Sequence, residues 1–362
     1  MNDNLKLCVC TFHNGFSPND IGGVSSAPIY LADQLRRYFS NVDLISLRST
    51  KDYLSPIASN VVYQSNPAVL DKYDFVIFTI PGLTYEKYNE VTPNKYVDVL
   101  EHAKKFTFIF NEENDRKMYP YHQNFLHHPN LAFMTFNCPG MATIFSDYIE
   151  EVCNDWEYVS FSPILPTKEE ILEKAKHKEN KIMSTCRWTT SKRIYEYLSM
   201  SEDFEKYGIK VFAAGAHQSY WYNLKMAELP THAYTDLGYF EPSQVPELLK
   251  DVAYHWNFLF QIRGMGLRTH QPRLEIATME AIREGCLPVV CEEFTPDWLG
   301  QDSAVRISKK NYTDIPKILG NMTDEERLNR ISTLYDLVNE NIISHYEVVA
   351  KHIEKSCSID KI

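Results

Sequence analysis

Continuous apolar runs of strand length alternate with amphipathic stretches along most of the chain. Residues 74–80 read DFVIFTI and residues 106–110 read FTFIF, while residues 94–103 between them have the spacing of a helix. A strand that is apolar on both sides has to be buried on both faces, as in parallel sheets that are covered by helices. The alternation therefore predicts an α/β fold with parallel sheets.

The alternation runs through the chain in two rounds. In the first round we expect strands at 5–11, 42–47, 74–80, 106–110 and 131–136, with helices at 28–39, 94–103 and 141–149. In the second round we expect strands at 181–186, 209–214, 256–262 and 287–291, with helices at 192–200, 246–253 and 275–284. Residues 324–357 end the pattern with helical periodicity.

The two rounds are separated by a change in character. Residues 162–166 read SPILP, and residues 168–181 are highly charged. A length of 362 residues also favours two domains over one. We therefore expect two doubly wound, Rossmann-like domains at 1–165 and 181–340, a linker at 166–180, and a final helix at 341–362 that packs back on the first domain. Ligands bind such sheets at the carboxyl ends of the strands, here in a cleft between the domains.

Composition narrows the class of protein. The 37 basic and 48 acidic residues give a net charge of −11, which argues against sequence-independent binding of nucleic acid but leaves room for a local basic cleft. No apolar run approaches the roughly 20 residues of a membrane span, and residues 1–4 lack the features of a secretory signal, so we expect a cytoplasmic protein without membrane contact. The eight cysteines form no C-x-x-C pair, which favours buried thiols over a zinc site or disulfides.

Two loops after predicted strands have the composition of ligand-binding loops. Gly22, Gly23 and Val24 precede the helix at 28–39, where a glycine pair lets backbone N–H groups approach an anion or a sugar, although a tight turn would explain the pair as well. Residues 181–193 contain four cations and no acid. Among these cations, Arg187 and Lys192 could converge on a diphosphate, and the alternative is a solvated basic turn.

A third loop and the helix after it form another candidate. Residues 263–273 contain three arginines, including Arg263, and no acid. Glu280 then lies on an apolar-faced helix that we expect to end at Gly285. A buried acid is costly without hydrogen-bond partners, and ribose hydroxyls would be suitable partners. The alternative is a glutamate on the solvated face of a core helix.

These segments resemble a known family. Glu280-Ala281, followed by Gly285 and by Pro288-Val289-Val290, resembles the nucleotide-sugar signature E-A-x-x-x-G-x-P-V of retaining GT-B glycosyltransferases, with one extra residue before the proline. Arg187 and Lys192 resemble the pair that binds the donor diphosphate in that family, and Gly22-Gly23-Val24 occupies the place of its first glycine loop. The resemblance implies a GT-B fold of two Rossmann-like domains facing across a cleft, and a UDP-sugar donor. The chain has no D-x-D metal motif, so we expect no metal and no cofactor.

A narrower resemblance concerns the acceptor. Most of the superfamily has a glutamate eight positions before Glu280, where this chain has Pro272, and Glu275 instead stands five positions before it. This arrangement looks like bacteriophage DNA α-glucosyltransferases, which modify 5-hydroxymethylcytosine, and it implies double-stranded DNA containing hydroxymethylated cytosine as partner. The chain departs from that group at residues 111–115, which read NEEND in place of a His-Asp pair, and at Arg193, where the group has glycine.

The resemblance assigns roles to particular residues. Arg187 and Lys192, helped by Arg263, would neutralise the leaving diphosphate, and Glu280 would bind the ribose. Glu275 and the backbone at Gly22, Gly23 and Val24 would orient the sugar or the phosphates. Glu112 or Glu113, after the strand at 106–110, would accept the proton of the acceptor. Two alternatives share the donor motifs: a glycosyltransferase acting on a cell-surface glycan or a small molecule, and a non-catalytic nucleotide-sugar-binding protein.

Overall fold

The chain folds into two compact units in this computed structural model. Unit 1 comprises Met1–Pro163 and Ile342–Ile362, and unit 2 comprises Ile164–Asn341. The structure describes residues 2–11, 23–47, 61–63, 66–79, 99–110, 127–137, 155–188, 192–216, 227–229, 231–258 and 274–358. Within these residues, no helix is both long and apolar enough to cross a membrane.

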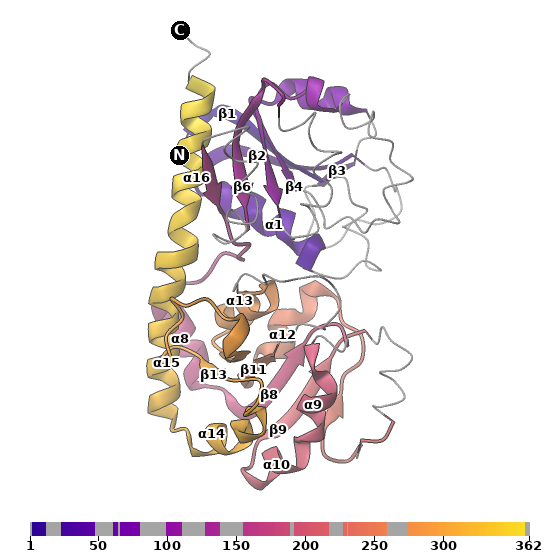
Figure 1. The fold of residues 1–362 in the computed structure, drawn as a ribbon, viewed down its shortest axis with the longest axis vertical. Coiled ribbons are helices and arrows are strands. Elements are labelled where there is room, and N and C mark those ends of the chain that lie inside the picture. The colour runs from indigo at the N-terminus through magenta and orange to yellow at the C-terminus, as the bar shows by residue number, and fades with distance from the viewer. Residues whose placement is uncertain are drawn as a thin grey trace. The chain divides into compact units, whose positions relative to one another are not determined.

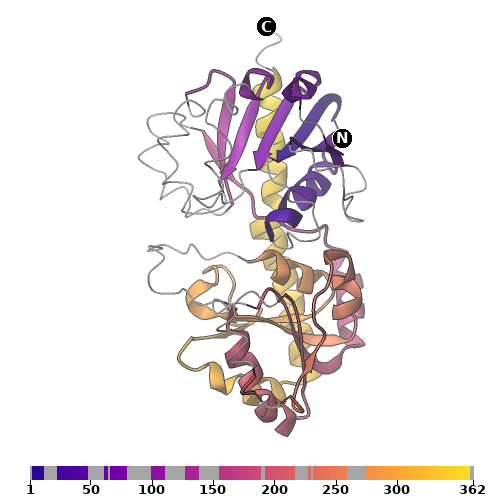
Figure 2. The ribbon, with the colours of Figure 1, turned by 90° about the vertical axis from the view of Figure 1, so that its right-hand side faces the viewer.

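A parallel sheet forms the centre of unit 1. Its described strands are ordered β3-β2-β1-β4-β5-β6-β7 and all run in the same direction (Figures 1 and 2). The central strands are buried on both faces, as their continuous apolar runs predict. The strands are β1 (Asn2–Thr11), β2 (Phe39–Ser46), β3 (Val61–Tyr63), β4 (Phe75–Thr79), β5 (Phe106–Phe110), β6 (Leu131–Phe136) and β7 (Trp156–Tyr158).

Unit 2 repeats this topology. Its described strands are ordered β10-β9-β8-β11-β12-β13 and are parallel (Figure 1). In both sheets the chain first builds outward on one side of the first strand and then crosses to its other side, which is the Rossmann strand order. The predicted fold class of two Rossmann-like doubly wound domains is confirmed. The strands are β8 (Glu179–Thr185), β9 (Lys210–Ala214), β10 (Thr235–Asp236), β11 (Val252–Asn257), β12 (Leu287–Cys291) and β13 (Val305–Ile307).

Helices cover both faces of the unit 2 sheet. One face packs on a large apolar core that includes Trp256, Tyr197 and Leu287, and the other on a smaller one that includes Met183, Leu249 and Ala281. The helices of the first core are α8 (Lys168–Lys176), α9 (Ile194–Ser199), α10 (Ser201–Lys206), α14 (Ile315–Asn321) and α15 (Asp324–Val338), and those of the second are α12 (Val245–Leu249) and α13 (Ile276–Arg283).

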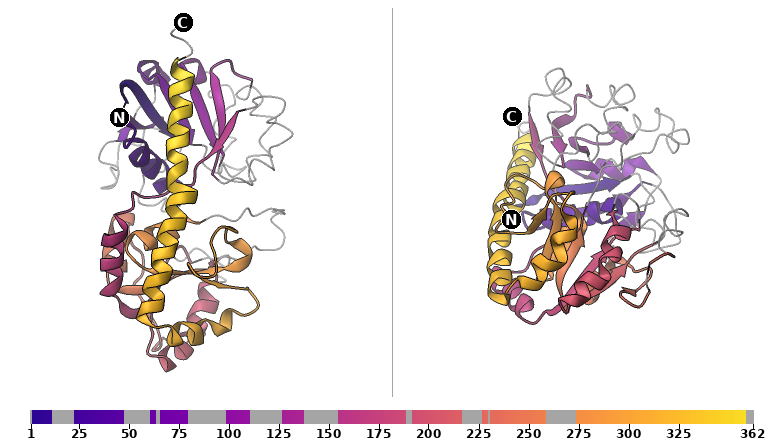
Figure 3. Two further views of the ribbon diagram at one scale, coloured as in Figure 1. Left: turned by 90° about the vertical axis from the view of Figure 1, so that its left-hand side faces the viewer. Right: turned by 60° about the horizontal axis from the view of Figure 1, so that its bottom comes forward.

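Helices α1 (Gly23–Leu35) and α16 (Ser344–Ser358) belong to unit 1, which also contains a 3₁₀ helix at Pro67–Lys72. Helix α1 follows β1 and has its Pro28 in the sixth helical position. The C-terminal helix α16 lies along unit 1 (Figure 3). The Tyr346 hydroxyl donates to the carbonyl of Ser160 at 2.7 Å and accepts from the N–H of Ser162 at 3.2 Å. These bonds attach α16 to the segment that follows β7.

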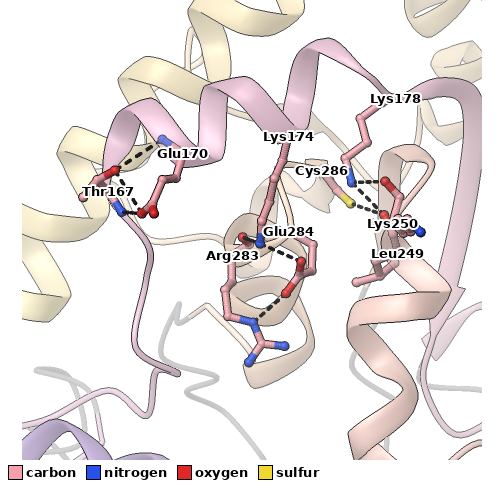
Figure 4. Close-up of polar contacts among 9 residues, drawn as sticks. All are labelled: Thr167, Glu170, Lys174, Lys178, Leu249, Lys250, Arg283, Glu284 and Cys286. Atoms are coloured by element: carbon pink, nitrogen blue, oxygen red, sulfur yellow. Dashed lines mark hydrogen bonds and ion pairs between the residues drawn. The ribbon is translucent and has the colours of Figure 1, made fainter.

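The charged segment that the sequence indicated as a linker contains helix α8 of unit 2. Thr167 and Glu170 form a reciprocal capping box at its start. The Lys174 ammonium donates to the Glu284 carboxylate at 2.9 Å and to the Arg283 carbonyl, while Lys178 donates to two carbonyls at the end of α12 (Figure 4). Cations are favoured at helix carboxyl ends. Lys174 and Lys178 thus bind the charged segment to the carboxyl ends of α12 and α13.

Other predicted elements differ from the structure in their bounds. The strand predicted at 256–262 is observed as β11 at Val252–Asn257, because the preceding helix α12 ends at Leu249 and not at residue 253. The helix predicted at 141–149 and the first half of the helix predicted at 94–103 lie outside the described residues. The helical region predicted at 324–357 consists of two helices, α15 and α16, which are joined by one π-helical segment, Asn339–Ile343.

Gly285 ends α13 in a conformation that only glycine adopts readily. Its φ is +77°, and a Cβ atom there would lie 2.9 Å from the Ile171 carbonyl oxygen and 3.0 Å from the Ala175 nitrogen of α8. We expect Gly285→Ala to lower the free energy of unfolding by about 2–4 kcal/mol, because the left-handed backbone and the displaced helix both cost energy. Urea denaturation of the purified variant measures this loss.

Gly208 provides the matched control for this prediction. Its φ is +69°, but a Cβ atom there would have no neighbour within 4 Å. Gly208→Ala should therefore cost only the backbone term of roughly 1 kcal/mol. Equal losses in the two variants would show that contact between Gly285 and α8 contributes nothing.

Candidate functional site

The carboxyl edge of the unit 2 sheet brings together most of the described candidate residues. The topological switch lies between β8 and β11, which end at Thr185 and Asn257. Ligands of open α/β sheets bind at such a point, outside the carboxyl ends of the strands. Arg187 and Lys192 follow β8, and Glu275 begins the helix that leads to β12.

Arg187 is exposed between two anchored residues. The N–H of Cys186 donates to the Ala214 carbonyl at 3.2 Å, and the N–H of Trp188 donates to the Ala216 carbonyl at 2.9 Å. The Trp188 side chain is almost fully buried in the core of unit 2. The backbone on both sides of Arg187 is therefore held in place, while its guanidinium can reach a ligand.

Gly215 fits this loop tightly. A Cβ atom at Gly215 would lie 1.8 Å from the carbonyl oxygen of Cys186, which leaves no room for a side chain. Its N–H donates to the Gly238 carbonyl after β10 at 2.8 Å. The loops after β8, β9 and β10 are thus joined by backbone hydrogen bonds at one edge of the sheet.

Lys192 and Glu275 form an ion pair, although they lie 83 positions apart in the sequence. Lys192 lies before α9, and Glu275 is the N-cap residue of α13. Their side chains are 20% and 24% exposed, so the pair is half-buried but accessible to a ligand. The structure therefore brings one predicted diphosphate ligand and one predicted sugar ligand into direct contact.

Glu280 lies further along α13 and is 6% exposed. Burial to this degree rules out the alternative of a fully solvated helix face. A carboxylate held this deep in a protein requires hydrogen-bonding or charged partners. Glu280 is thus an acid in a place where its charge has to be compensated.

Arg193 adopts a backbone conformation that favours glycine. Its φ of 53° and ψ of 35° are left-handed, and it is the one such non-glycine residue in the described part of the chain. Its guanidinium pairs with Glu196 at 2.7 Å. A glycine would adopt this backbone without strain. Arg193 therefore occupies a turn position that favours glycine and adds a cation beside the loop.

A layer of buried polar side chains lies on the α13 side of the sheet at this edge. The Thr185 hydroxyl and the His255 Nε2 atom are 2.9 Å apart, and the Asn257 amide donates to the Thr278 hydroxyl. The His255 Nδ1 atom is buried and has no hydrogen-bond partner among the described residues. Burial and the nearby charge of Lys192 lower the pKa of His255 to about 3. The imidazole is therefore neutral at physiological pH.

A small crevice opens beside this layer. Its volume is about 10 Å³, roughly the room for one water molecule. Oxygen and nitrogen atoms from α13 and from the ends of β11 and β12 can face a ligand there. The crevice is lined by Asn257, Leu274, Glu275, Thr278, Val290, Cys291, Phe294 and Thr295.

The other predicted site residues lie in unit 1 or outside the described residues. Helix α1 begins at Gly23, five residues before the predicted start at residue 28, so Gly23 and Val24 lie in its first turn and not in a loop before it. Four predicted site residues lie outside the described residues: Gly22, Glu112, Glu113 and Arg263.

Four further residues at this edge are not indicated by the sequence pattern. Leu237 and Tyr239, directly after β10, are 44% and 52% exposed and lie two positions apart. Thr185 is the last residue of β8, and His255 lies shortly before the end of β11. Neither residue belongs to a sequence motif. Thr185 lies near the end of the strand predicted at 181–186, and this position is a signal that points to it, whereas no predicted strand ends at His255, Leu237 or Tyr239.

The buried neutral imidazole of His255 makes folding sensitive to acid. Because its folded pKa lies below the ordinary value of 6.5, the unfolded chain binds a proton first as the pH falls. Stability from this group is complete above pH 6.5 and declines as the pH falls towards 3. Between pH 7 and pH 5 we expect His255 to account for a loss of about 2 kcal/mol.

Urea denaturation of the wild type and of His255→Gln at both pH values measures this contribution. The variant cannot titrate at this position, so its loss between pH 7 and pH 5 should be smaller by that amount. His128 and His345, whose pKa values are also lowered by burial, contribute equally to both proteins. Parallel pH profiles would contradict a neutral His255.

Comparison with known proteins shows which solved structures share this architecture. No model of a known protein family matches the chain, and no curated protein is similar to it in sequence. Solved structures are similar to it over nearly its whole length. HepE from Anabaena, solved with UDP and glucose, matches with a TM-score of 0.63 at 10% identity, covering 97% of this chain and 100% of its own.

Two further solved structures extend the comparison. AviGT4, a glycosyltransferase of avilamycin A biosynthesis, matches with a TM-score of 0.61 at 14% identity and 98% coverage of both chains. A DNA-modifying β-glucosyltransferase, studied with and without uridine diphosphoglucose, matches with a TM-score of 0.57 at 13% identity, covering 98% of this chain and 99% of its own. The organisation of two Rossmann-like units over the full length is shared with these proteins, and the chain has the GT-B fold.

Proposed function

We propose that the chain is a UDP-sugar-dependent glycosyltransferase that needs no cofactor and moves a sugar, with retention at the anomeric carbon, to a hydroxyl group. One observation carries the proposal. Arg187 follows β8 at the topological switch of unit 2, Lys192 and Glu275 form an ion pair there, and the buried acid Glu280 lies on the helix that Glu275 caps. Cations for a diphosphate and acids for hydroxyl groups are the chemistry that a nucleotide sugar requires.

The cations would act on the leaving group. Transfer breaks the bond between the anomeric carbon and the diphosphate, and negative charge develops on UDP as the bond breaks. Preorganised cations stabilise such charge without further reorganisation. Arg187 is held between anchored residues and offers bidentate contacts, and Lys192 adds a compact charge. Arg263, which lies outside the described residues, would join them.

Two other groups would bind the nucleoside. The buried carboxylate of Glu280 would accept hydrogen bonds from the ribose hydroxyls, which are suitable partners for an acid in a buried site. The exposed side chains of Leu237 and Tyr239 follow β10 at the same edge, and Gly238 between them is bonded to the loop after β9. An aromatic ring and an aliphatic side chain there would cover a flat base.

For the acceptor we propose 5-hydroxymethylcytosine in double-stranded phage DNA. The order of Arg187, Lys192, Glu275 and Glu280 resembles the phage DNA α-glucosyltransferases, and a DNA-modifying glucosyltransferase is among the proteins of similar fold. Glu112 or Glu113, after β5, would accept the proton of the hydroxymethyl group. The chain would then act in the host cytoplasm.

A panel of UDP-sugars tests donor and acceptor together. The purified chain is incubated with each donor and with duplex DNA containing either hydroxymethylcytosine or cytosine, and the nucleosides are analysed by mass spectrometry. We expect one donor to add its sugar mass to hydroxymethylcytosine only, with the α configuration by NMR of the product. Release of UDP without modified DNA would indicate a small molecule or a glycan as acceptor, and UDP binding without turnover would overturn the enzymatic assignment.

A further inference from the structure

The ion pair between Lys192 and Glu275 occupies two groups that the proposed donor also needs. The two side chains contact each other directly and are each about one-fifth to one-quarter exposed. Lys192 would bind the diphosphate and Glu275 the sugar. Without a ligand, the carboxylate neutralises the cation on which the diphosphate depends.

The two parts of a UDP-sugar affect this carboxylate in opposite ways. The diphosphate is an anion, so beside the Lys192 ammonium it is repelled by Glu275 and has to compete with it. The sugar hydroxyls are neutral donors, so they can bond to the Glu275 carboxylate and replace the contact that it loses. Glu275 therefore lowers the affinity of the site for UDP alone. When the sugar is attached, its bonds to Glu275 restore the affinity that is lost in this way.

We infer that Glu275 makes the site discriminate between the sugar-linked donor and free UDP, by re-pairing with Lys192 when the sugar has left. The inference rests on the proposed function and goes beyond it, because it assigns Glu275 to the release of the product. The carboxylate closes on the ammonium as the sugar departs and lowers the affinity for the UDP that remains.

Calorimetric titration with UDP and with UDP-glucose, without acceptor, tests this inference. For Glu275→Gln, which keeps the shape but removes the charge, we expect UDP to bind about three- to tenfold more tightly than to the wild type. The affinity of this variant for UDP-glucose should rise less than its affinity for UDP, or should fall, because the glutamine amide accepts hydrogen bonds from the sugar hydroxyls less well than the carboxylate does. The ratio of the two affinities should therefore shift towards UDP.

Two controls separate the ion pair from a general change of charge. Glu196→Gln removes one negative charge from the ion pair with Arg193, beside the same loop, and should change the UDP affinity less than twofold. In the Lys192→Met background, Glu275→Gln should no longer increase the UDP affinity, since the residue acts through Lys192. A purely structural role for Glu275 would not produce this dependence on Lys192.

The outcomes distinguish this inference from the proposed function. If the wild type binds UDP, but Glu275→Gln binds it equally or more weakly, the discrimination by Glu275 is wrong and the donor site stands. The same conclusion follows if Glu196→Gln has an equal effect, or if the gain persists without Lys192. If no UDP binds to the wild type or to any variant, both proposals fail.

Discussion

Arg187→Ala should lower the rate of sugar transfer by about 10²- to 10³-fold, because the variant loses a preorganised cation at the developing charge of the leaving diphosphate. The free energy of unfolding should stay within about 0.5 kcal/mol of the wild type, since the Arg187 side chain is exposed and its neighbours hold the loop through backbone atoms. Steady-state rates of UDP release with the best donor of the panel measure the first effect, and urea denaturation measures the second.

Two variants sharpen this prediction. Arg187→Lys keeps the charge but cannot make bidentate contacts, so its rate should lie between those of the wild type and the alanine variant. Lys210→Ala removes an equal charge from the exposed amino-terminal end of β9, at the opposite edge of the same sheet, and should leave the rate unchanged. A similar loss in Lys210→Ala, or full activity in Arg187→Ala, would remove Arg187 from the site.

Strands of high apolar content were predicted most closely from the sequence. The strands β5, β6 and β12 have the predicted bounds, because a largely apolar run such as FTFIF ends where charged or polar residues begin. The strand predicted at 256–262 is shifted, because residues 252 and 253 are part of the helix predicted at 246–253 and residues 254 and 255 of no predicted element. The short strands β3, β10 and β13 carry too few residues to give a periodic signal.

The charged segment at 168–181 shows a different limit. Only Ile171 and Ala175 of α8 are buried, and the other residues of the helix are lysines, glutamates and one leucine. Its place in unit 2 depends on contacts to Glu284 and to the end of α12, which lie more than 70 positions away in the sequence. Local composition therefore indicated a linker where tertiary contacts hold a helix.

The candidate site shows the same division. The sequence indicates Lys192 and Glu275 separately, because each stands at the start of a predicted helix. Their ion pair spans 83 positions and depends on the strand order β8-β11, which the sequence pattern does not specify. His255 was missed because a single histidine in an apolar strand has no motif, and its buried, neutral state arises from packing.

Glu280→Gln should weaken the binding of UDP by about 10- to 100-fold, because each ribose hydroxyl would lose a charge-assisted acceptor inside a buried site. The loss should depend on the ribose. The wild type should bind UDP at least tenfold more tightly than 2′,3′-dideoxy-UDP, whereas Glu280→Gln should bind the two ligands with nearly equal affinity. Calorimetric titration of both proteins with both ligands gives the coupling directly.

Glu284 supplies the matched control for this experiment, because it is equally buried at 8% exposure and stands one turn later in the same segment. Its carboxylate pairs with Lys174 and Arg283. Glu284→Gln should therefore lower the stability of unit 2 but preserve the preference for UDP over its dideoxy analogue. If Glu280→Gln also preserved that preference, the buried charge of Glu280 would serve the folding of α13 and not the recognition of ribose.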